Sequence, residues 1–226
     1  MSRKISEIIE IVKKELSSSA HDLEHTFRVL KLAKRIAEKE GKVNMEVIEL
    51  AALLHDIARV KEDSDKTGNT DHAVLGAEMA RKILSDLGYP NETVDAVCHA
   101  IRTHRFRGEN VPETIEAKIL FDADKLDAIG AVGIARAYMI AGERGEPLYR
   151  EVSDLDAYKK ENLVGGKLNG RIKDISKHSV NIEYETKFKK IPDRLFTETA
   201  RKIAKGRIEF MAQYFGRLKK EIEGEA

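Results

Sequence analysis

Residues 45–56, MEVIELAALLHD, decide the fold of this 226-residue chain. Asn44 precedes them and is a favourable residue to cap the start of a helix. The centre of the stretch, residues 50–54, is entirely apolar. A helix that is apolar around most of its circumference has to be covered by other elements. The stretch therefore predicts a buried central helix that ends in the polar pair His55-Asp56.

Amphipathic patterns flank this helix on both sides. Apolar residues recur at helical spacing, and Gly41, Gly88 and Pro90 stand where helices are expected to end. No segment gives a persuasive series of alternating strands, although VNIEY at residues 180–184 allows a short hairpin. The sequence predicts an all-α, compact helical bundle in a single domain, residues 1–226. The expected helices cover residues 5–16, 27–37, 45–58, 72–87, 91–103, 112–120, 128–141 and 192–223.

Residues 142–185 interrupt the helical pattern. Five of the fifteen glycines lie between Gly142 and Gly170, and the basic residues Lys167, Arg171 and Lys173 stand close to them. Long loops in helical domains often bind ligands or close over a site. We expect a long loop excursion here, before the C-terminal helix, and favour a lid. An oligomer contact or a solvated insertion is the alternative.

The composition excludes several classes of protein. Lys and Arg number 40 against 39 Asp and Glu, so the chain lacks the basic excess typical of proteins that bind long nucleic acids. No apolar run approaches the roughly 20 residues that span a bilayer. A single cysteine, Cys98, excludes an internal disulfide framework. We expect a cytoplasmic protein without a membrane partner.

His55 and Asp56 are the first candidate functional residues. A polar pair at the end of a buried helix is costly unless partners satisfy it. A divalent metal ion would do so, because it accepts neutral imidazole and carboxylate ligands. His25, on the apolar side of an earlier helix, and Asp124, at the end of another buried segment, are further candidates. Each alone is more often a core residue or a cap, but the ordered set predicts a metal site.

Four short motifs carry a resemblance to a known family. They are HDLEHTFRV at residues 21–29, LLHDIAR at 53–59, DHAVLGA at 71–77 and DADKLDAIG at 122–130. In this order they resemble the HD-domain phosphohydrolase superfamily, in particular its small predicted bacterial and archaeal members. The resemblance covers residues 18–140 and is weaker near residues 200–207.

The resemblance implies which residues bind the metal. It makes His25, His55, Asp56 and Asp124 the ligands of a divalent ion, namely Mn, Mg, Co, Ni, Fe or Zn. Asp122 is the alternative to Asp124. The family pattern places a basic and an apolar residue after the ligand, which favours Asp124. Whether one or two ions bind stays open.

The same motifs supply candidate catalytic and substrate-binding groups. The expected catalytic residues are Asp56, Glu24 and Asp127, with either of the last two as general base. The expected phosphate-binding residues are Arg28, Arg59, Lys125, His72 and His104. In some branches of the superfamily, histidines at comparable places bind a second metal instead.

The function that the resemblance implies is hydrolysis at phosphorus. We expect a metal-dependent phosphohydrolase of phosphatase, phosphodiesterase or pyrophosphatase type. It would use metal-activated water to cleave a phosphate ester or phosphoanhydride of a small, nucleotide-like metabolite. The alternatives are a di-iron oxygenase of the HD type and a non-enzymatic HD-fold sensing module. The expected partner is a phosphorylated metabolite, and the oligomeric state, with a homodimer among the options, stays open.

Overall fold

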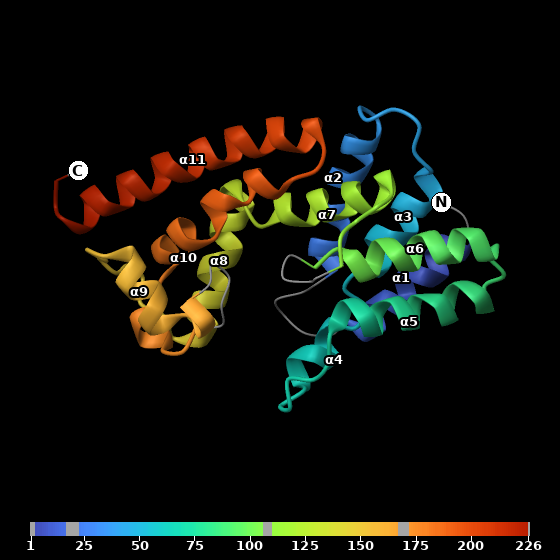
Figure 1. The fold of residues 1–226 in the computed structure, drawn as a ribbon, viewed down its shortest axis with the longest axis horizontal. Helices are drawn as coiled ribbons and strands as arrows, with labels where there is room; N and C mark the ends of the chain where they lie inside the picture. Colours follow the sequence, from blue (N-terminus) through green and yellow to red (C-terminus); the bar gives the residue numbers. More distant parts are fainter. Residues whose placement is uncertain (1–2, 17–22, 106–109, 167–171, 226) are drawn as a thin grey trace. The chain divides into compact units, whose positions relative to one another are not determined.

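The computed structural model describes residues 3–16, 23–105, 110–166 and 172–225, which fold mainly as helices (Figure 1). Among these described residues, the only β-type pairing is an isolated antiparallel bridge between Leu163 and Ile172. The predicted all-α fold is confirmed. The α-helices are α1 (Arg3–Glu15), α2 (Leu23–Ala37), α3 (Met45–Leu54), α4 (Arg59–Ser64), α5 (His72–Asp86), α6 (Asn91–Thr103), α7 (Ile115–Asp127), α8 (Gly130–Arg144), α9 (Leu155–Asn162), α10 (Val180–Thr186) and α11 (Glu198–Ile222). The 3-10 helices are η1 (Val164–Gly166), η2 (Ile175–Lys177), η3 (Phe188–Lys190) and η4 (Pro192–Arg194).

The chain divides into two compact units. The first contains Met1–Lys125 and Leu195–Ala200, and the second contains Leu126–Arg194 and Arg201–Ala226. The expected single domain over residues 1–226 stays a prediction. Across the described ranges, no helix is long and apolar enough to cross a membrane.

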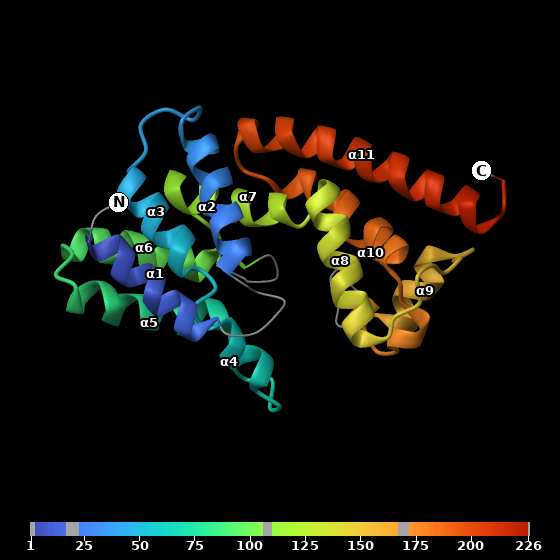
Figure 2. The same cartoon turned by 180° about the vertical axis from the view of Figure 1, so that it is seen from behind.

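α3 is the centre of the first unit. The side-chain oxygen of Asn44 accepts hydrogen bonds from the backbone N–H groups of Glu46 and Val47, at 3.1 and 3.3 Å, and so caps its first turn. Residues 50–54 are at most 1% exposed. α2 and α6 pack against α3, and α1 also contacts it (Figure 2). Because other helices cover α3, the His55-Asp56 pair that follows it lies in the interior.

α5 and α6 lie side by side and bring two further histidines to the same end of the unit. The carboxylate of Asp71 caps the start of α5 by accepting two backbone hydrogen bonds. Gly88, at φ 69°, and Pro90 form the turn to α6, as the sequence predicts. His72 is the first residue of α5 and His104 follows the last residue of α6, so the turn places them together.

The expected loop over residues 142–185 is wrong in its described part. α8 continues to Arg144 and ends at Gly145, whose φ of 69° permits the left-handed C-cap. α9 and α10 then contribute to a small apolar core. The core contains Tyr158, Leu163 and Ile182, with Val152, Leu155 and Ile172 packed against it. Of the residues on which the lid depends, Lys167, Gly170 and Arg171 lie outside the described residues, and the lid stays a prediction. Lys173 is described, and its Nζ donates to the carbonyl of Glu161 at 3.0 Å.

The short hairpin that the sequence allows at residues 180–184 does not form, because these residues belong to α10. Val180, Ile182 and Tyr184 are all buried, which no single face of a helix would give. α10 is enclosed on more than one side, and the ring of Tyr184 stacks on that of Phe215 from α11 with 4.8 Å between centroids. The burial therefore alternates like that of a strand, although the backbone is helical.

Candidate metal centre

His25, His55, Asp56 and Asp124 come together inside the first unit. α2 supplies His25, the end of α3 supplies the pair, and α7 supplies Asp124. Nε2 of His25 lies 3.3 Å from Nε2 of His55, 3.6 Å from Oδ2 of Asp56 and 3.4 Å from Oδ1 of Asp124. Nε2 of His55 lies 3.5 Å from the same Oδ2 of Asp56. The four predicted ligands therefore form one cluster, in which Asp124 is partly exposed, and their role as ligands stays a prediction.

A second pair of histidines faces the other oxygen of Asp56. Oδ1 of Asp56 lies 3.5 Å from Nε2 of His72 and 3.6 Å from Nε2 of His104. The two Nε2 atoms are 3.3 Å apart. Asp56, His72 and His104 thus make a second group with suitable spacing for a metal ion. The two groups share one carboxylate, and phosphate binding by His72 and His104 stays a prediction.

The hydrogen bonds behind three of the rings fix which nitrogen carries the proton. Nδ1 of His55 donates to the carbonyl of Ala52 at 2.9 Å, and Nδ1 of His104 donates to the carbonyl of Ile101 at 2.6 Å. A carbonyl only accepts, so Nδ1 holds the hydrogen and Nε2 of the neutral ring presents a lone pair. Nδ1 of His72 lies 2.8 Å from a carboxylate oxygen of Glu62, which gives the same tautomer.

This arrangement fits a cation. Around Oδ1 of Asp56, two imidazole lone pairs and a carboxylate oxygen converge, and in the neutral rings none of the three has a hydrogen to donate to the others. Three buried acceptors that face one another are unfavourable until a positive charge lies between them. Imidazole nitrogen and carboxylate oxygen are the donors that first-row divalent ions accept.

Burial keeps His55 and His72 in the form that binds metal. It lowers the pKa of His55 from 6.5 to about 4, and it also lowers the pKa of His72. Burial alone would raise the pKa of Asp124, but Lys125 and His25 outweigh it and hold that pKa well below its ordinary value. Neutral imidazole and ionised carboxylate are the states required for metal binding, so neutral pH suits the site.

The lowered pKa of His55 predicts how the stability of the metal-free protein depends on pH. Between pH 6.5 and about 4 the unfolded chain protonates this histidine and the folded chain does not. The free energy of unfolding should therefore fall as the pH is lowered through this window, by about 3 kcal/mol from His55 alone. Urea denaturation at several pH values measures it. His55→Asn should flatten the dependence; equal slopes for both proteins would contradict the assignment.

The structure separates Asp122 from Asp124. The Asp122 carboxylate is fully buried and accepts hydrogen bonds from the backbone N–H of Phe196 at 2.9 Å, and from both the N–H and the hydroxyl of Thr197 at 2.7 Å. These contacts attach residues 195–200 to the rest of the first unit. Asp124 instead faces His25, which favours Asp124 as the fourth ligand.

The predicted cations lie beside the acidic groups of the site. Nζ of Lys125 lies 2.5 Å from Oδ2 of Asp124, on the carboxylate edge away from His25. Arg28, one turn after His25, pairs with Glu24 at 3.9 Å. Arg59 is the first residue of α4. It pairs with Glu62 at 2.8 Å and with Asp63 at 3.3 Å. Phosphate binding by these three stays a prediction, with least support for Arg59 because two carboxylates already engage it.

The two expected general bases receive little support. The side chain of Glu24 is 84% exposed, unlike the buried cluster that begins with the next residue. Asp127 belongs to the second unit, where its carboxylate accepts a hydrogen bond from Arg136 at 2.8 Å. Their catalytic roles remain predictions.

Glu62 and Arg105 are neighbours of the site that the sequence did not single out. Partial burial would raise the pKa of Glu62, but the hydrogen bond from His72 and the charges of Arg59 and Arg105 lower it to about 2. Glu62 lies in a polar segment without periodicity, six residues after Asp56. No signal in that segment distinguishes it from the acids around it.

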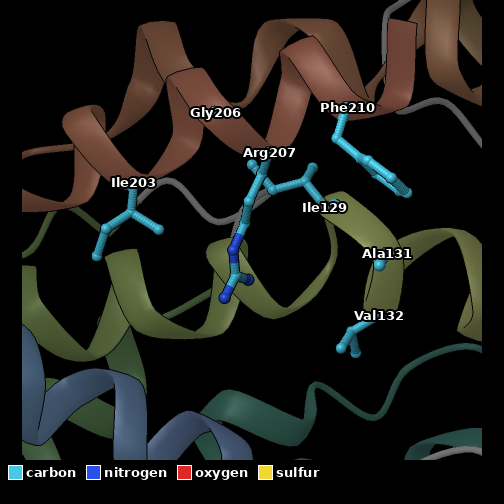
Figure 3. A pocket seen from close by; sticks show the side chains of 8 residues that line it. Ile129, Ala131, Val132, Ile203, Gly206, Arg207 and Phe210 are labelled. Atoms are coloured by element: carbon cyan, nitrogen blue, oxygen red, sulfur yellow. The ribbon is translucent and has the colours of Figure 1, made fainter. Parts of the chain in front are cut away.

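The second unit has a hollow of its own, of about 370 Å³, between the start of α8 and α11 (Figure 3). Arg207 extends across it from α11 and donates a hydrogen bond to the carbonyl of Leu126. Gly130, at φ 81°, allows this approach, since a Cβ there would lie 2.9 Å from the Arg207 side chain. The remaining lining is mainly apolar: Ile129, Ala131, Val132, Ile203, Gly206 and Phe210. The hollow contains none of the predicted ligands.

Comparison with known proteins agrees with the motifs. Residues 22–129 match the HD domain family. The Bacillus subtilis protein YpgQ is 36% identical over 211 residues, which cover 92% of this chain and 87% of YpgQ. The 3'-5' exoribonuclease YhaM of Listeria monocytogenes is 29% identical over 116 residues, but these cover only 37% of that enzyme and 46% of this chain.

Solved structures extend the likeness over nearly the whole chain. The crystal structure of Bacillus subtilis YpgQ in complex with ADP matches with a TM-score of 0.70 and 33% identity, over 97% of this chain and 95% of that one. A predicted HD superfamily hydrolase from an uncultured Thermotogales bacterium matches with a TM-score of 0.63 and 32% identity, over 97% and 91%. The motifs, the helical fold and these relatives agree, and the chain belongs to the HD-domain phosphohydrolase superfamily.

Proposed function

We propose that this protein is a metal-dependent phosphohydrolase that cleaves a phosphate ester or phosphoanhydride of a small, nucleotide-like metabolite. The observation that carries the proposal is the convergence of two histidine pairs on the two oxygens of Asp56. The buried acceptors of His72, His104 and Asp56 are suited to divalent ions and to little else. The ADP in the YpgQ crystal structure supports a nucleotide as the ligand class.

The residues divide into two ligand groups that share Asp56. His25, His55, Asp56 and Asp124 would hold one ion, and His72 and His104 with the same carboxylate would hold another. A bound divalent ion supplies Lewis acidity toward a phosphoryl oxygen and toward water.

The remaining groups of the chain act around these ligands. The Nδ1 hydrogen bonds hold the rings with Nε2 toward Asp56, so that little reorganisation is needed on binding. Lys125 and Arg28 lie beside the ligands and would offset negative charge on a phosphate. Lys125 reaches Asp124 at 2.5 Å, which keeps its ammonium group near the cluster.

A small substrate fits the charge of the chain better than a long nucleic acid does. Lys and Arg exceed Asp and Glu by one in total, and binding to long nucleic acids requires many basic contacts along the backbone. The similarity to an exoribonuclease covers only part of that enzyme. We therefore expect release of phosphate or pyrophosphate from free nucleotides to be faster than degradation of single-stranded RNA.

The same shared carboxylate favours a second candidate, a di-iron oxygenase. Two histidine pairs around one carboxylate also suit iron. Oxygen consumption and phosphate release, measured with the iron-loaded and the manganese-loaded protein, distinguish the two candidate functions. Oxygen consumption coupled to product formation, without release of phosphate from any nucleotide, would replace the hydrolase proposal.

Ion removal tests the proposal directly. Treatment with a chelator should abolish phosphate release from a panel of nucleoside mono-, di- and triphosphates, and added Mn²⁺ should restore it, as followed by ³¹P NMR. The unfolding temperature should fall on removal, because an ion at 100 times its dissociation constant stabilises the fold by about 2.7 kcal/mol. Undiminished hydrolysis by protein that elemental analysis shows to be free of metal would contradict the proposal.

A further inference from the structure

The carboxylate of Glu62 contacts the cluster from outside. Its Oε2 lies 2.8 Å from Nδ1 of His72, on the opposite side of the ring from Nε2. That Nε2 faces inward, 3.5 Å from Oδ1 of Asp56 and 3.3 Å from Nε2 of His104. One imidazole ring therefore connects Glu62 to the shared carboxylate.

Two arginines hold Glu62 in place. Arg59 donates to Oε2 at 2.8 Å, and Arg105 lies 2.9 Å from Oε1. Arg105 also pairs with Asp71 at 2.6 Å. Asp71 precedes His72 in the chain, and Arg105 follows His104. The network thus fixes the backbone next to both histidines of the second group.

The chemistry of these contacts decides the tautomer of His72. A carboxylate at 2.8 Å can only accept, so Nδ1 of His72 must be the donor. Nη1 of Arg59 also lies 3.2 Å from Nδ1, but a guanidinium cannot accept, so both donors share the oxygen of Glu62. The lone pair of Nε2 is left pointing toward Asp56.

We propose that Glu62 is a positioning residue, which locks His72 in this tautomer and so sets the affinity of the Asp56–His72–His104 group for a divalent ion. Loss of the outer partner of a ligand histidine typically weakens metal binding by about 10–100-fold. The inference rests on the proposed function only in that it treats this group as an ion site. It makes no assumption about which substrate is cleaved.

The test compares three variants of the full chain. Glu62→Ala removes the acceptor, while Glu62→Gln keeps the size and one acceptor oxygen but not the charge. Asp63→Asn is the matched control, because Asp63 also pairs with Arg59, at 3.3 Å, and is the next residue in α4. Long-range ¹⁵N–¹H NMR of the metal-free proteins reports the tautomer of His72. Titration with Mn²⁺, together with elemental analysis after dialysis, reports the number of ions and their affinities.

We expect two ions in the wild type and in Asp63→Asn, with His72 in the Nδ1–H form. Glu62→Ala should lose the fixed tautomer and bind the weaker ion about 10–100-fold less tightly, and Glu62→Gln should lie between it and the wild type. The stronger ion should be retained in all of them. A single ion in the wild type, or a tautomer and affinities in Glu62→Ala that match the control, would overturn the proposal.

The NMR and binding measurements need no substrate, so they are independent of the function proposed above. If Glu62→Ala loses the weaker ion and no nucleotide is hydrolysed by the wild type, Glu62 keeps its role and the hydrolase proposal fails. If hydrolysis occurs and Glu62→Ala behaves as the control does, the hydrolase proposal stands and the role of Glu62 is refuted.

Discussion

Asp56→Asn is expected to remove bound divalent ions and hydrolysis together. Both oxygens of Asp56 face histidine pairs, so one substitution weakens both groups. The loss of ion affinity should exceed the roughly 10–100-fold typical for removing an outer partner of a ligand. Elemental analysis of dialysed protein and ³¹P NMR of the nucleotide reactions measure the two effects.

The fold should survive this change. An amide nitrogen in place of a carboxylate oxygen can donate to an imidazole lone pair, so metal-free Asp56→Asn should be at least as stable as the metal-free wild type. Asp95→Asn is a suitable control, since Asp95 is an exposed acid on α6 that pairs with Arg81 at 2.7 Å. Full ion occupancy in the folded Asp56→Asn protein would refute the shared-ligand assignment.

Asp122→Ala is expected to damage the fold instead of the ion site. The substitution leaves the N–H of Phe196 and both donors of Thr197 without their buried acceptor. Each buried donor left without a partner costs about 1–3 kcal/mol, so the loss of all three hydrogen bonds should lower the free energy of unfolding by at least about 3 kcal/mol. Urea denaturation of the metal-free proteins gives this value.

Asp124→Asn provides the contrast. Asp124 faces His25 and Lys125, so its loss should weaken ion binding, while all three donors to Asp122 keep their buried acceptor. The two aspartates stand two residues apart in one helix, which makes them a matched pair. If Asp122→Ala lost the ion and kept its stability, the roles assigned to the two residues would have to be exchanged.

The sequence predicted the parts of the structure that depend on local pattern. Residues 50–54 are apolar on all sides, and α3 is buried as this pattern requires. The turn at Gly88 and Pro90 set the limits of α5 and α6, which agree with the prediction within one residue. The cluster of His25, His55-Asp56 and Asp124 was predicted from their positions at the ends or on the inner faces of buried helices.

The parts that escaped prediction depend on contacts between distant segments. Residues two apart on a helix point about 200° from each other, so Asp122 and Asp124 must face different neighbours. The packing of residues 195–200 decides that Asp122 faces this segment and that Asp124 faces the predicted metal ligands. Likewise, Glu62 acquires its role through His72 and Arg105, which approach it from α5 and from the end of α6. The small core around Tyr158 was not predicted, because residues 142–185 are rich in glycine and their apolar side chains meet only when the segment folds back on itself.

The first unit is assembled from two stretches of chain, and this has a consequence for its synthesis. Residues 1–125 leave the ribosome first, but residues 195–200 follow only after the segment between them has been translated. At about 5–20 residues per second, the delay is several seconds. During that time the nascent chain already carries every predicted metal ligand, yet Asp122 lacks the donors of Phe196 and Thr197. A chain released before residue 195 would therefore contain the complete ligand set without the contacts that stabilise the fold around it.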